Sequence, residues 1–181
     1  EALVIVSNAI GIRLLAGSSL EVDELTYFDE NDIAVQIDPG TVSGDVTWAA
    51  PRYVSILMNG SVTIAAGASL TVKPETVIKI AQNSIFTVDG KLIALGTEES
   101  PIFFTDLRDN STGGEIPGAD SLPEAGWWRS ISVRNDGSAY FDWCRISYGG
   151  RSDGGAIVKS GTGALSVSNS VIAYTSGDGL R

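Results

Sequence analysis

Short apolar runs, separated at near-regular intervals by turn residues, dominate this chain. Between residues 61 and 105 these runs are broken by Gly, Asn, Asp, Ser or Pro, and they are Ser61–Ile64, Ser69–Val72, Thr76–Ile80, Ser84–Val88, Lys91–Leu95 and Pro101–Thr105. Strands this short, with no helical period between them, predict an all-β fold. Three such strands in every ~20–25 residues are typical of a β-solenoid, in which each coil stacks on the next.

Two later segments can be superimposed on each other. Phe141–Tyr148 reads FDWCRISY and Val167–Tyr174 reads VSNSVIAY, which matches Phe141 with Val167, Ile146 with Ile172 and Tyr148 with Tyr174. Alternate residues in each copy are apolar, as expected where one face of a strand points into a solenoid interior. The repeat is therefore more than a bias in composition.

An antiparallel sandwich or a jelly roll is the alternative, because Asn59-Gly60 and Asp89-Gly90 are hairpin signals. The equal spacing of so many short strands favours the coil. We predict one domain over residues 1–181, a single-stranded right-handed parallel β-helix of about seven coils, with a long loop insertion over residues 106–126.

Two phrases in the middle of the chain carry a family resemblance. They read SVTIAAGASLTVKPETVIKI and FTVDGKLIALGTEESPIFFT, and the second contains a V-x-G-x-L-x-A-x-G-T turn at Val88, Gly90, Leu92, Ala94, Gly96 and Thr97. Together with the opener Gly126–Ile131, they resemble right-handed parallel β-helix (pectin-lyase-like) domains of secreted and cell-surface microbial proteins. The resemblance implies an extracellular or cell-surface location and contact with glycans. It does not single out an activity, since this fold serves many functions.

Composition excludes several classes of function. Lys and Arg number 12 against 22 Asp and Glu, and this net charge of −10 argues against nucleic acid and anionic membranes as partners. The chain has no His, which removes the Ser-His-Asp triad and most zinc sites. Its single Cys144 cannot form an internal disulfide, and we expect it to be buried as a small apolar side chain. No stretch reaches the length of a membrane-spanning helix.

Two groups of residues are candidates for acid–base chemistry. Asp106, Arg108 and Asp109 stand at the start of the long loop, where we expect solvent-exposed charges. Asp142 and Arg145 are read as lying on one strand, where a spacing of three points them to opposite faces. Neither group predicts a shared catalytic site, so we expect no catalytic residue and no cofactor.

Calcium is the one ion that the sequence offers ligands for. Asp29-Glu30-Asn31-Asp32 and Asp106-x-x-Asp109-Asn110 supply hard oxygen atoms, but neither has the spacing of an EF-hand loop or a calcium-binding nonapeptide. We interpret both as turns carrying solvated acids, with weak calcium binding as the alternative.

Aromatic and glycosylation motifs add candidates for surface contacts. Trp127 and Trp128 are adjacent, so a strand would turn one inward and the other outward, where it could be covered by the loop or could stack on a sugar ring. Asn110 and Asn59 each begin an N-x-S/T sequence, and Asn110 lies in the more loop-like region.

A structural role is the function that these observations favour. We expect a non-catalytic module of a secreted or cell-surface protein, acting as a stalk, an adhesin or a self-assembling unit. A carbohydrate-binding or polysaccharide-cleaving domain is the alternative. The strand-like Leu3–Val6 and the strand opening at Gly179 have no polar caps, so we also expect head-to-tail stacking on a second copy or on flanking coils.

Overall fold

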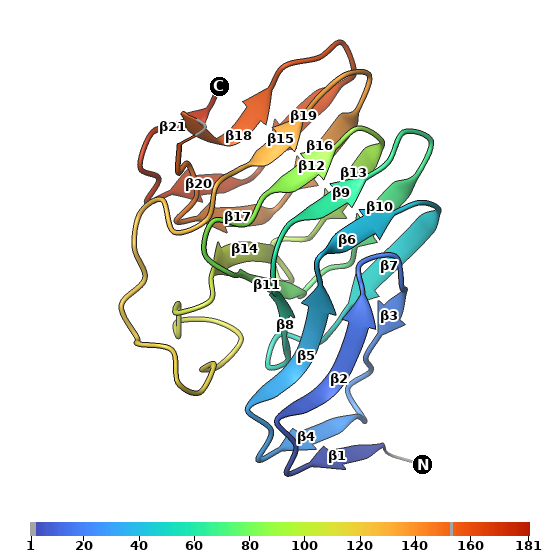
Figure 1. Cartoon of the computed structure of the whole chain (residues 1–181), viewed down its shortest axis with the longest axis vertical. Coiled ribbons are helices and arrows are strands. Elements are labelled where there is room, and N and C mark those ends of the chain that lie inside the picture. The colour runs from blue at the N-terminus through green and yellow to red at the C-terminus, as the bar shows by residue number, and fades with distance from the viewer. Residues whose placement is uncertain (1–2, 153) are drawn as a thin grey trace.

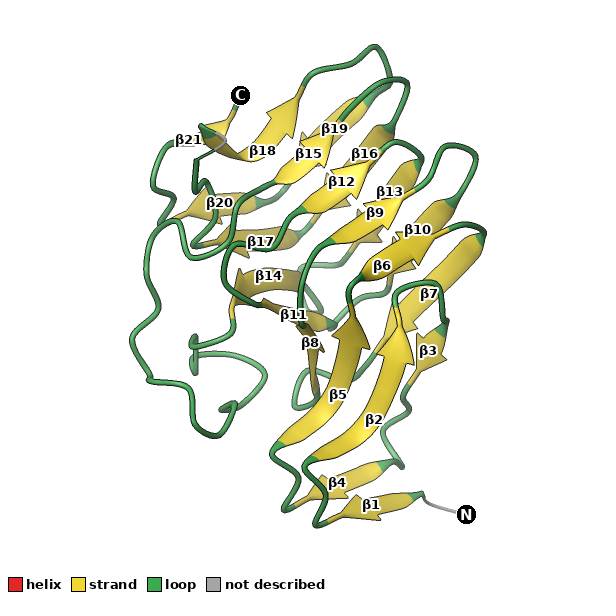
Figure 2. Cartoon of the chain, viewed as in Figure 1, coloured by secondary structure: helices red, strands yellow, loops and turns green. Residues whose placement is uncertain are grey.

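The computed structural model describes residues 3–152 and 154–181, which form a parallel β-solenoid of about seven coils (Figure 1). All strand pairs in the described residues are parallel, and Figure 2 shows strands and loops with no helix among them. The predicted all-β solenoid is thus confirmed, and the antiparallel alternative is wrong. None of the described residues belongs to a helix that could span a membrane.

Three sheets run along the stack, and each of the five middle coils contributes one strand to each of them in turn. Sheet 1 has seven strands, which are β2 (Ile10–Leu15), β5 (Ile33–Asp38), β8 (Ser55–Met58), β11 (Val77–Ile80), β14 (Ile102–Asp106), β17 (Cys144–Ser147) and β20 (Val171–Ala173). Sheet 2 has six, which are β6 (Gly40–Val42), β9 (Val62–Ile64), β12 (Phe86–Val88), β15 (Ile131–Val133), β18 (Gly155–Lys159) and β21 (Asp178–Leu180).

Sheet 3 completes each coil with six strands, which are β3 (Leu20–Glu21), β7 (Asp45–Ala49), β10 (Ser69–Val72), β13 (Lys91–Leu95), β16 (Ser138–Asp142) and β19 (Leu165–Ser168). The predicted internal repeat is confirmed by its register. Phe141 pairs with Val167 in sheet 3 and Ile146 pairs with Ile172 in sheet 1.

The corner between sheets 2 and 3 brings successive coils very close together. A Cβ atom on Gly90 would lie 2.2 Å from the carbonyl oxygen of Ala65, and one on Gly137 would lie 2.1 Å from that of Val88. No side chain fits at these distances, so glycine is required where one backbone rests on another.

Inward-facing side chains fill the space between the three sheets. The rings of Trp48, Phe86, Phe104 and Phe141 follow one another through it, with centroids 6.0 to 6.2 Å apart. Trp48 and Phe141 come from sheet 3, Phe86 from sheet 2 and Phe104 from sheet 1. This aromatic column ties the central coils together through tilted and edge-to-face contacts.

The first two coils differ from the rest. β1 (Val4–Val6) and β4 (Tyr27–Asp29) pair with each other in a separate two-stranded sheet, seen at the foot of Figure 1. Later coils have a turn in the corresponding place, such as the one at residues 51–54. A short strand thus precedes the sheet 1 strand in the first two coils, and a turn takes its place in the third.

Candidate functional site

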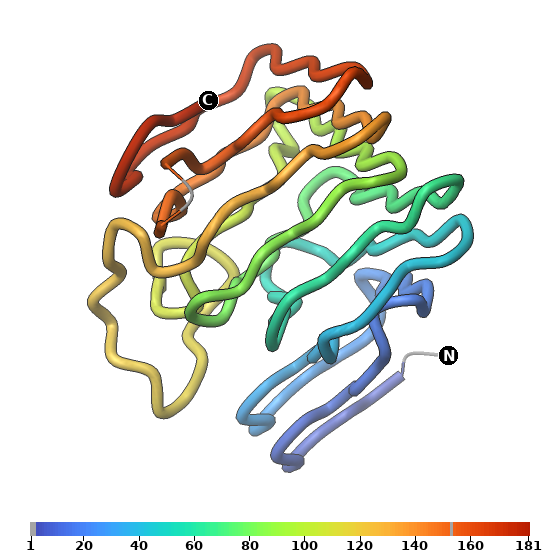
Figure 3. Tube along the Cα trace, turned by 45° about the horizontal axis from the view of Figure 1, so that its top comes forward, coloured from blue at the N-terminus to red at the C-terminus, as the bar shows by residue number. Residues whose placement is uncertain are grey.

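A single long connection lies on the outer face of sheet 1. It joins β14 to β15, and we call its residues 107–130 the strap, the yellow and gold segment of Figures 1 and 3. The predicted insertion over residues 106–126 thus begins one residue later and ends four residues later. It was expected to be solvated, but it covers outward-facing side chains of sheet 1. A Cβ on Gly113 would lie 2.8 Å from Cγ1 of Val77 and 3.1 Å from Cβ of Ser55.

The expectation of exposed charges at the start of this segment is wrong. Asp106, Arg108 and Asp109 are 0%, 8% and 7% exposed. Asp106 pairs in register with Ile80, whose side chain belongs to the core, so the strand carries its carboxylate below the surface. Tertiary folding of the strap, rather than local composition, decides the burial of these groups.

Arg108 is the centre of an ion-pair network inside the strap. Its Nη2 lies 2.8 Å from Oδ2 of Asp106, and Nη1 lies 3.5 Å from Oδ1 of Asp120. Its guanidinium carbon lies 3.4 Å from the centre of the Trp127 ring, so the cation covers one face of that indole. The hydrogen bond to Asp106 raises the pKa of Arg108, which keeps the guanidinium charged.

Lys79 joins the strap to the sheet beneath it. This residue of β11 is 0% exposed, and its Nζ donates to the carbonyl oxygen of Asp109 at 2.9 Å and to that of Gly114. Burial lowers the pKa of Lys79, while the nearby carboxylates of Asp109, Asp106 and Glu115 oppose that shift. Sequence reasoning missed this residue, because a Lys at an outward position of a strand is expected to be solvated.

The remaining oxygens of the network also have partners. Oδ2 of Asp109 accepts from the Thr105 hydroxyl at 2.6 Å, and Oδ1 accepts from the hydroxyl and the amide of Ser111. The second carboxylate, Asp106, accepts from Arg108 and from the amide of Glu124. Buried groups that are satisfied in this way fix a conformation.

Asp142 and Arg145 were read as members of one strand, which is wrong. Asp142 ends β16 in sheet 3 and Arg145 lies in β17 in sheet 1, with the chain turning between them at Trp143, whose φ is 49°. Asp142 accepts hydrogen bonds from the side chains of Ser168 and Asn169. Arg145 is exposed, with its guanidinium carbon 6.0 Å from the centre of the Phe103 ring. The structure does not bring the two charges together.

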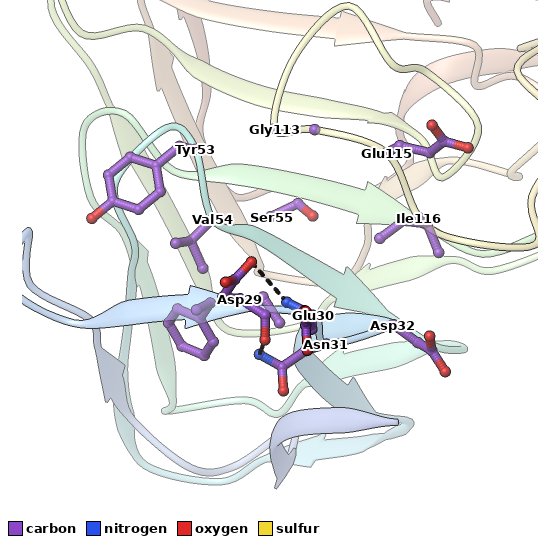
Figure 4. A pocket seen from close by; sticks show the side chains of 13 residues that line it. Asp29, Glu30, Asn31, Asp32, Tyr53, Val54, Ser55, Gly113, Glu115 and Ile116 are labelled. Atoms are coloured by element: carbon purple, nitrogen blue, oxygen red, sulfur yellow. Dashed lines mark hydrogen bonds between the residues drawn. The ribbon is translucent and has the colours of Figure 1, made fainter. Parts of the chain in front are cut away.

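A hollow of about 190 Å³ lies where the tip of the strap meets the turn between β4 and β5 (Figure 4). Asp29, Glu30 and Asp32 of the turn line one side, and Glu115 and Ile116 of the strap line another. This turn is the first predicted calcium segment. Within residues 3–152 and 154–181, no three acidic, His or Cys side chains converge as they would around a metal ion.

A second hollow, of about 170 Å³, lies on the other side of the strap. It is lined by Asp109 and Ser111 of the strap, by Arg145 and by the rings of Tyr148 and Tyr174. Aromatic rings, hydroxyls and one exposed guanidinium make this hollow suited to a polar ligand with flat apolar faces.

The two tryptophans at the end of the strap have separate surroundings. Trp128 is 0% exposed, and its Nε1 donates to the carbonyl oxygen of Ser147 at 2.9 Å. The sequence left open that Trp128 stacks on a sugar ring, but a buried side chain cannot form an exposed stacking surface. Trp127 is partly buried against the core, and Arg108 occupies one face of its ring.

The sequon asparagines and the cysteine lie in contrasting places. Asn110 and Asn59 are both exposed, and Nδ2 of Asn110 donates to the Ser121 hydroxyl at 2.8 Å.

Cys144 is 1% exposed, as expected for an apolar role, and burial raises the pKa of its thiol to about 12. Its Sγ–H contacts the carbonyl oxygen of Ala94 at 3.3 Å.

No family model, curated protein or solved structure matches this chain. The likeness to pectin-lyase-like domains consequently rests on the two sequence phrases and on the solenoid architecture.

Proposed function

We propose that this chain is a structural module of a secreted or cell-surface protein, and that further coils stack on its terminal coils. One observation carries the proposal. Val167 faces inward in register with Phe141, and Leu180 is in register with Ile157, yet Val167 and Leu180 are 37% and 50% exposed while their partners are buried. Apolar side chains in core columns lose their free energy of burial unless another coil covers them.

The buried charges support a scaffold rather than an enzyme. Asp106, Arg108, Asp109 and Lys79 hold the strap in place through mutual contacts and backbone carbonyls. A catalytic acid or base needs a proton-transfer partner that is free to meet the substrate. We expect no turnover of neutral or acidic polysaccharides, which a reducing-sugar assay with the Asp106→Asn variant as comparison would check.

Stacking is tested by light scattering over a concentration series, together with negative-stain microscopy. The two ends of the module differ, so stacking is a head-to-tail contact between copies. Such contacts extend into filaments as the concentration rises, unless the rotation between successive copies closes them into a ring. Val167→Asp should abolish the lengthening. Ser166→Asp is the matched control, since Ser166 is the outward neighbour in register with Tyr140. A chain that stays monomeric at high concentration would exclude self-stacking.

Glycan binding is the second candidate, and the hollow beside Tyr148 and Tyr174 favours it. Sugar rings stack on aromatic side chains, and hydroxyls and guanidinium groups bind their oxygens. Calorimetric titration with a panel of neutral and acidic oligosaccharides tests this candidate. Binding that Tyr174→Ala weakens by about tenfold would support it, and no binding to any member of the panel would contradict it.

A further inference from the structure

The strap covers side chains that point away from the solenoid interior. Leu57, Val77, Lys79 and Thr105 occupy outward positions of β8, β11 and β14, yet each is at most 5% exposed. At the far end of the same sheet, Arg13 is exposed in a corresponding outward position. Gly113 of the strap lies against Val77, and Lys79 and Thr105 are hydrogen-bonded to the strap, so the strap hides these three side chains.

Residues 107–126 of the strap contribute little to the core, in contrast to Trp128 at its end. Before Trp127, only Ile116 among its apolar residues is buried, and Ile116 is not part of the main core cluster. Its attachments are instead the Lys79 hydrogen bonds, the Thr105–Asp109 hydrogen bond and the Arg108 network. Segments held by a few polar contacts open at a lower free energy than packed strands do.

The sheets do not depend on the strap. β14 pairs with β11 and β17, and β15 pairs with β12 and β18, so each flanking strand keeps both of its neighbours if the strap moves. The backbone hydrogen bonds between the strap and the coils lie at its two ends, where the Leu107 amide donates to Ile80 and the Arg129 amide donates to Ser84, so residues 108–126 can move without breaking them. The two hollows lie on opposite sides of the strap, and displacement of residues 108–126 would leave Val77 and Lys79 as open surface between them.

We infer that residues 108–126 of the strap form a movable cover, latched by Lys79, which opens while the solenoid stays folded and joins the two hollows into one groove across sheet 1. The inference stands independently of the proposed structural role, because it rests only on the contacts of the strap.

Lysine labelling measures the opening directly. The chain has four lysines, and Lys73 and Lys91 are exposed while Lys79 is not. Native protein is treated with an amine-acetylating reagent, and the modification of each lysine is followed by peptide mass spectrometry. Amide hydrogen exchange of β11 and β14 is followed under the same conditions.

The movable cover has a specific kinetic signature. Relative to Lys73 and Lys91, Lys79 should be protected from acetylation at least about tenfold, and this protection should be at least about tenfold smaller than the protection of the β11 amides relative to unstructured amides. If Lys79 is protected as strongly as those amides, its exposure requires unfolding of the solenoid and the inference is overturned. If Lys79 reacts as fast as Lys73, the strap is not closed, and the inference fails as well.

Two adjacent glycines provide a matched pair of variants. Gly113 and Gly114 both have positive φ, 69° and 76°, so alanine strains the backbone to a similar degree at each. A methyl group on Gly113 meets Val77 at 2.8 Å, whereas one on Gly114 meets nothing within 4 Å. Gly113→Ala should therefore accelerate acetylation of Lys79 by about tenfold relative to Gly114→Ala. Equal rates in the two variants would contradict the idea that strap contact with sheet 1 controls access to Lys79.

Discussion

The phenol rings of Tyr148 and Tyr174 stack with their centroids 5.3 Å apart and their planes 12° from parallel. Both residues have positive φ, 66° and 53°, so each occupies the same uncommon backbone conformation one coil apart. The stack is thus a side-chain extension of the backbone ladder, and it holds the last two coils of sheet 1 together outside the core.

A double-mutant cycle should detect this stack. Tyr148→Ala and Tyr174→Ala each remove one ring, and the double variant should be more stable than the sum of the two effects predicts, by about 0.5–1.5 kcal/mol. Urea unfolding followed by circular dichroism gives the free energy of unfolding of the natural chain and of each of the three variants. If the two single effects add up to the double effect within about 0.3 kcal/mol, each ring stabilises the fold through its own burial alone, and the contact between the rings adds nothing.

Asp106→Asn should be strongly destabilising. The change removes the charge paired with Arg108, whose side chain is only 9% exposed, and an uncompensated buried charge costs about 3 kcal/mol or more. Asp120→Asn is the control of identical chemistry. Asp120 contacts the same Arg108 at 3.5 Å but is 63% exposed, so its loss should cost less than about 1 kcal/mol. Similar losses from both variants in urea unfolding would refute a buried pair.

Cys144 should make stability fall at alkaline pH. Its pKa is raised from 9.0 to about 12 because burial disfavours the thiolate, so the folded state holds the proton more tightly than the unfolded state does. The contribution of the protonated Cys144 thiol to the free energy of unfolding is fully present below pH 9, and it is lost as pH rises from 9 to about 12. Each pKa unit is worth about 1.4 kcal/mol, which sets the size of the change.

Cys144→Ala separates this effect from those of other alkaline groups. The variant should show a shallower fall of unfolding free energy between pH 9 and 11 than the natural chain. An unchanged slope would show that other groups account for the pH dependence. The native thiol should also resist iodoacetamide until the protein is unfolded.

Asn110 should carry a glycan when the chain is secreted by a host that glycosylates N-x-S/T sequences. It is exposed at the start of the strap, and its amide contacts only the Ser121 hydroxyl in the described structure. Intact mass spectrometry should show the loss of one glycan in Asn110→Gln. Asn59→Gln is the comparison, since Asn59 lies at a tight corner beside Gly60, whose φ is 133°. A mass unchanged by Asn110→Gln would disprove use of this site.

The sequence predicted the repeating architecture well because solenoid strands obey a local rule. Alternating apolar residues face inward, and equivalent residues pair in the next coil, so Phe141 with Val167 and Ile146 with Ile172 could be matched from the sequence alone. The burial of Lys79 could not be predicted in this way. Its partners, Asp109 and Gly114, lie 30 and 35 residues further along the chain, in a segment whose composition is typical of solvated loops.

The Asp142–Arg145 error has a similar physical origin. A corner made by one residue, Trp143, interrupts an otherwise continuous strand pattern and moves the two charges onto different sheets. A bulky residue with positive φ leaves no signature that a single sequence can reveal, whereas the Asn169 at the corresponding corner is a residue type often found in that conformation. Glycine marks the corners between sheets 2 and 3, as at Gly90 and Gly137. At Trp143 the tertiary structure imposes the turn.

Sheet 1 tolerates great differences in the length of chain that joins its strands. Phe104 and Ile146 are register neighbours although the strap lies between them, while Ile146 and Ile172 are neighbours through an ordinary coil. The exit from β14 is thus a position where new sequence can be acquired without altering the repeat. Evolution could diversify the surface there at little risk to folding, and a protein engineer could graft a foreign epitope or a short binding peptide at the same position.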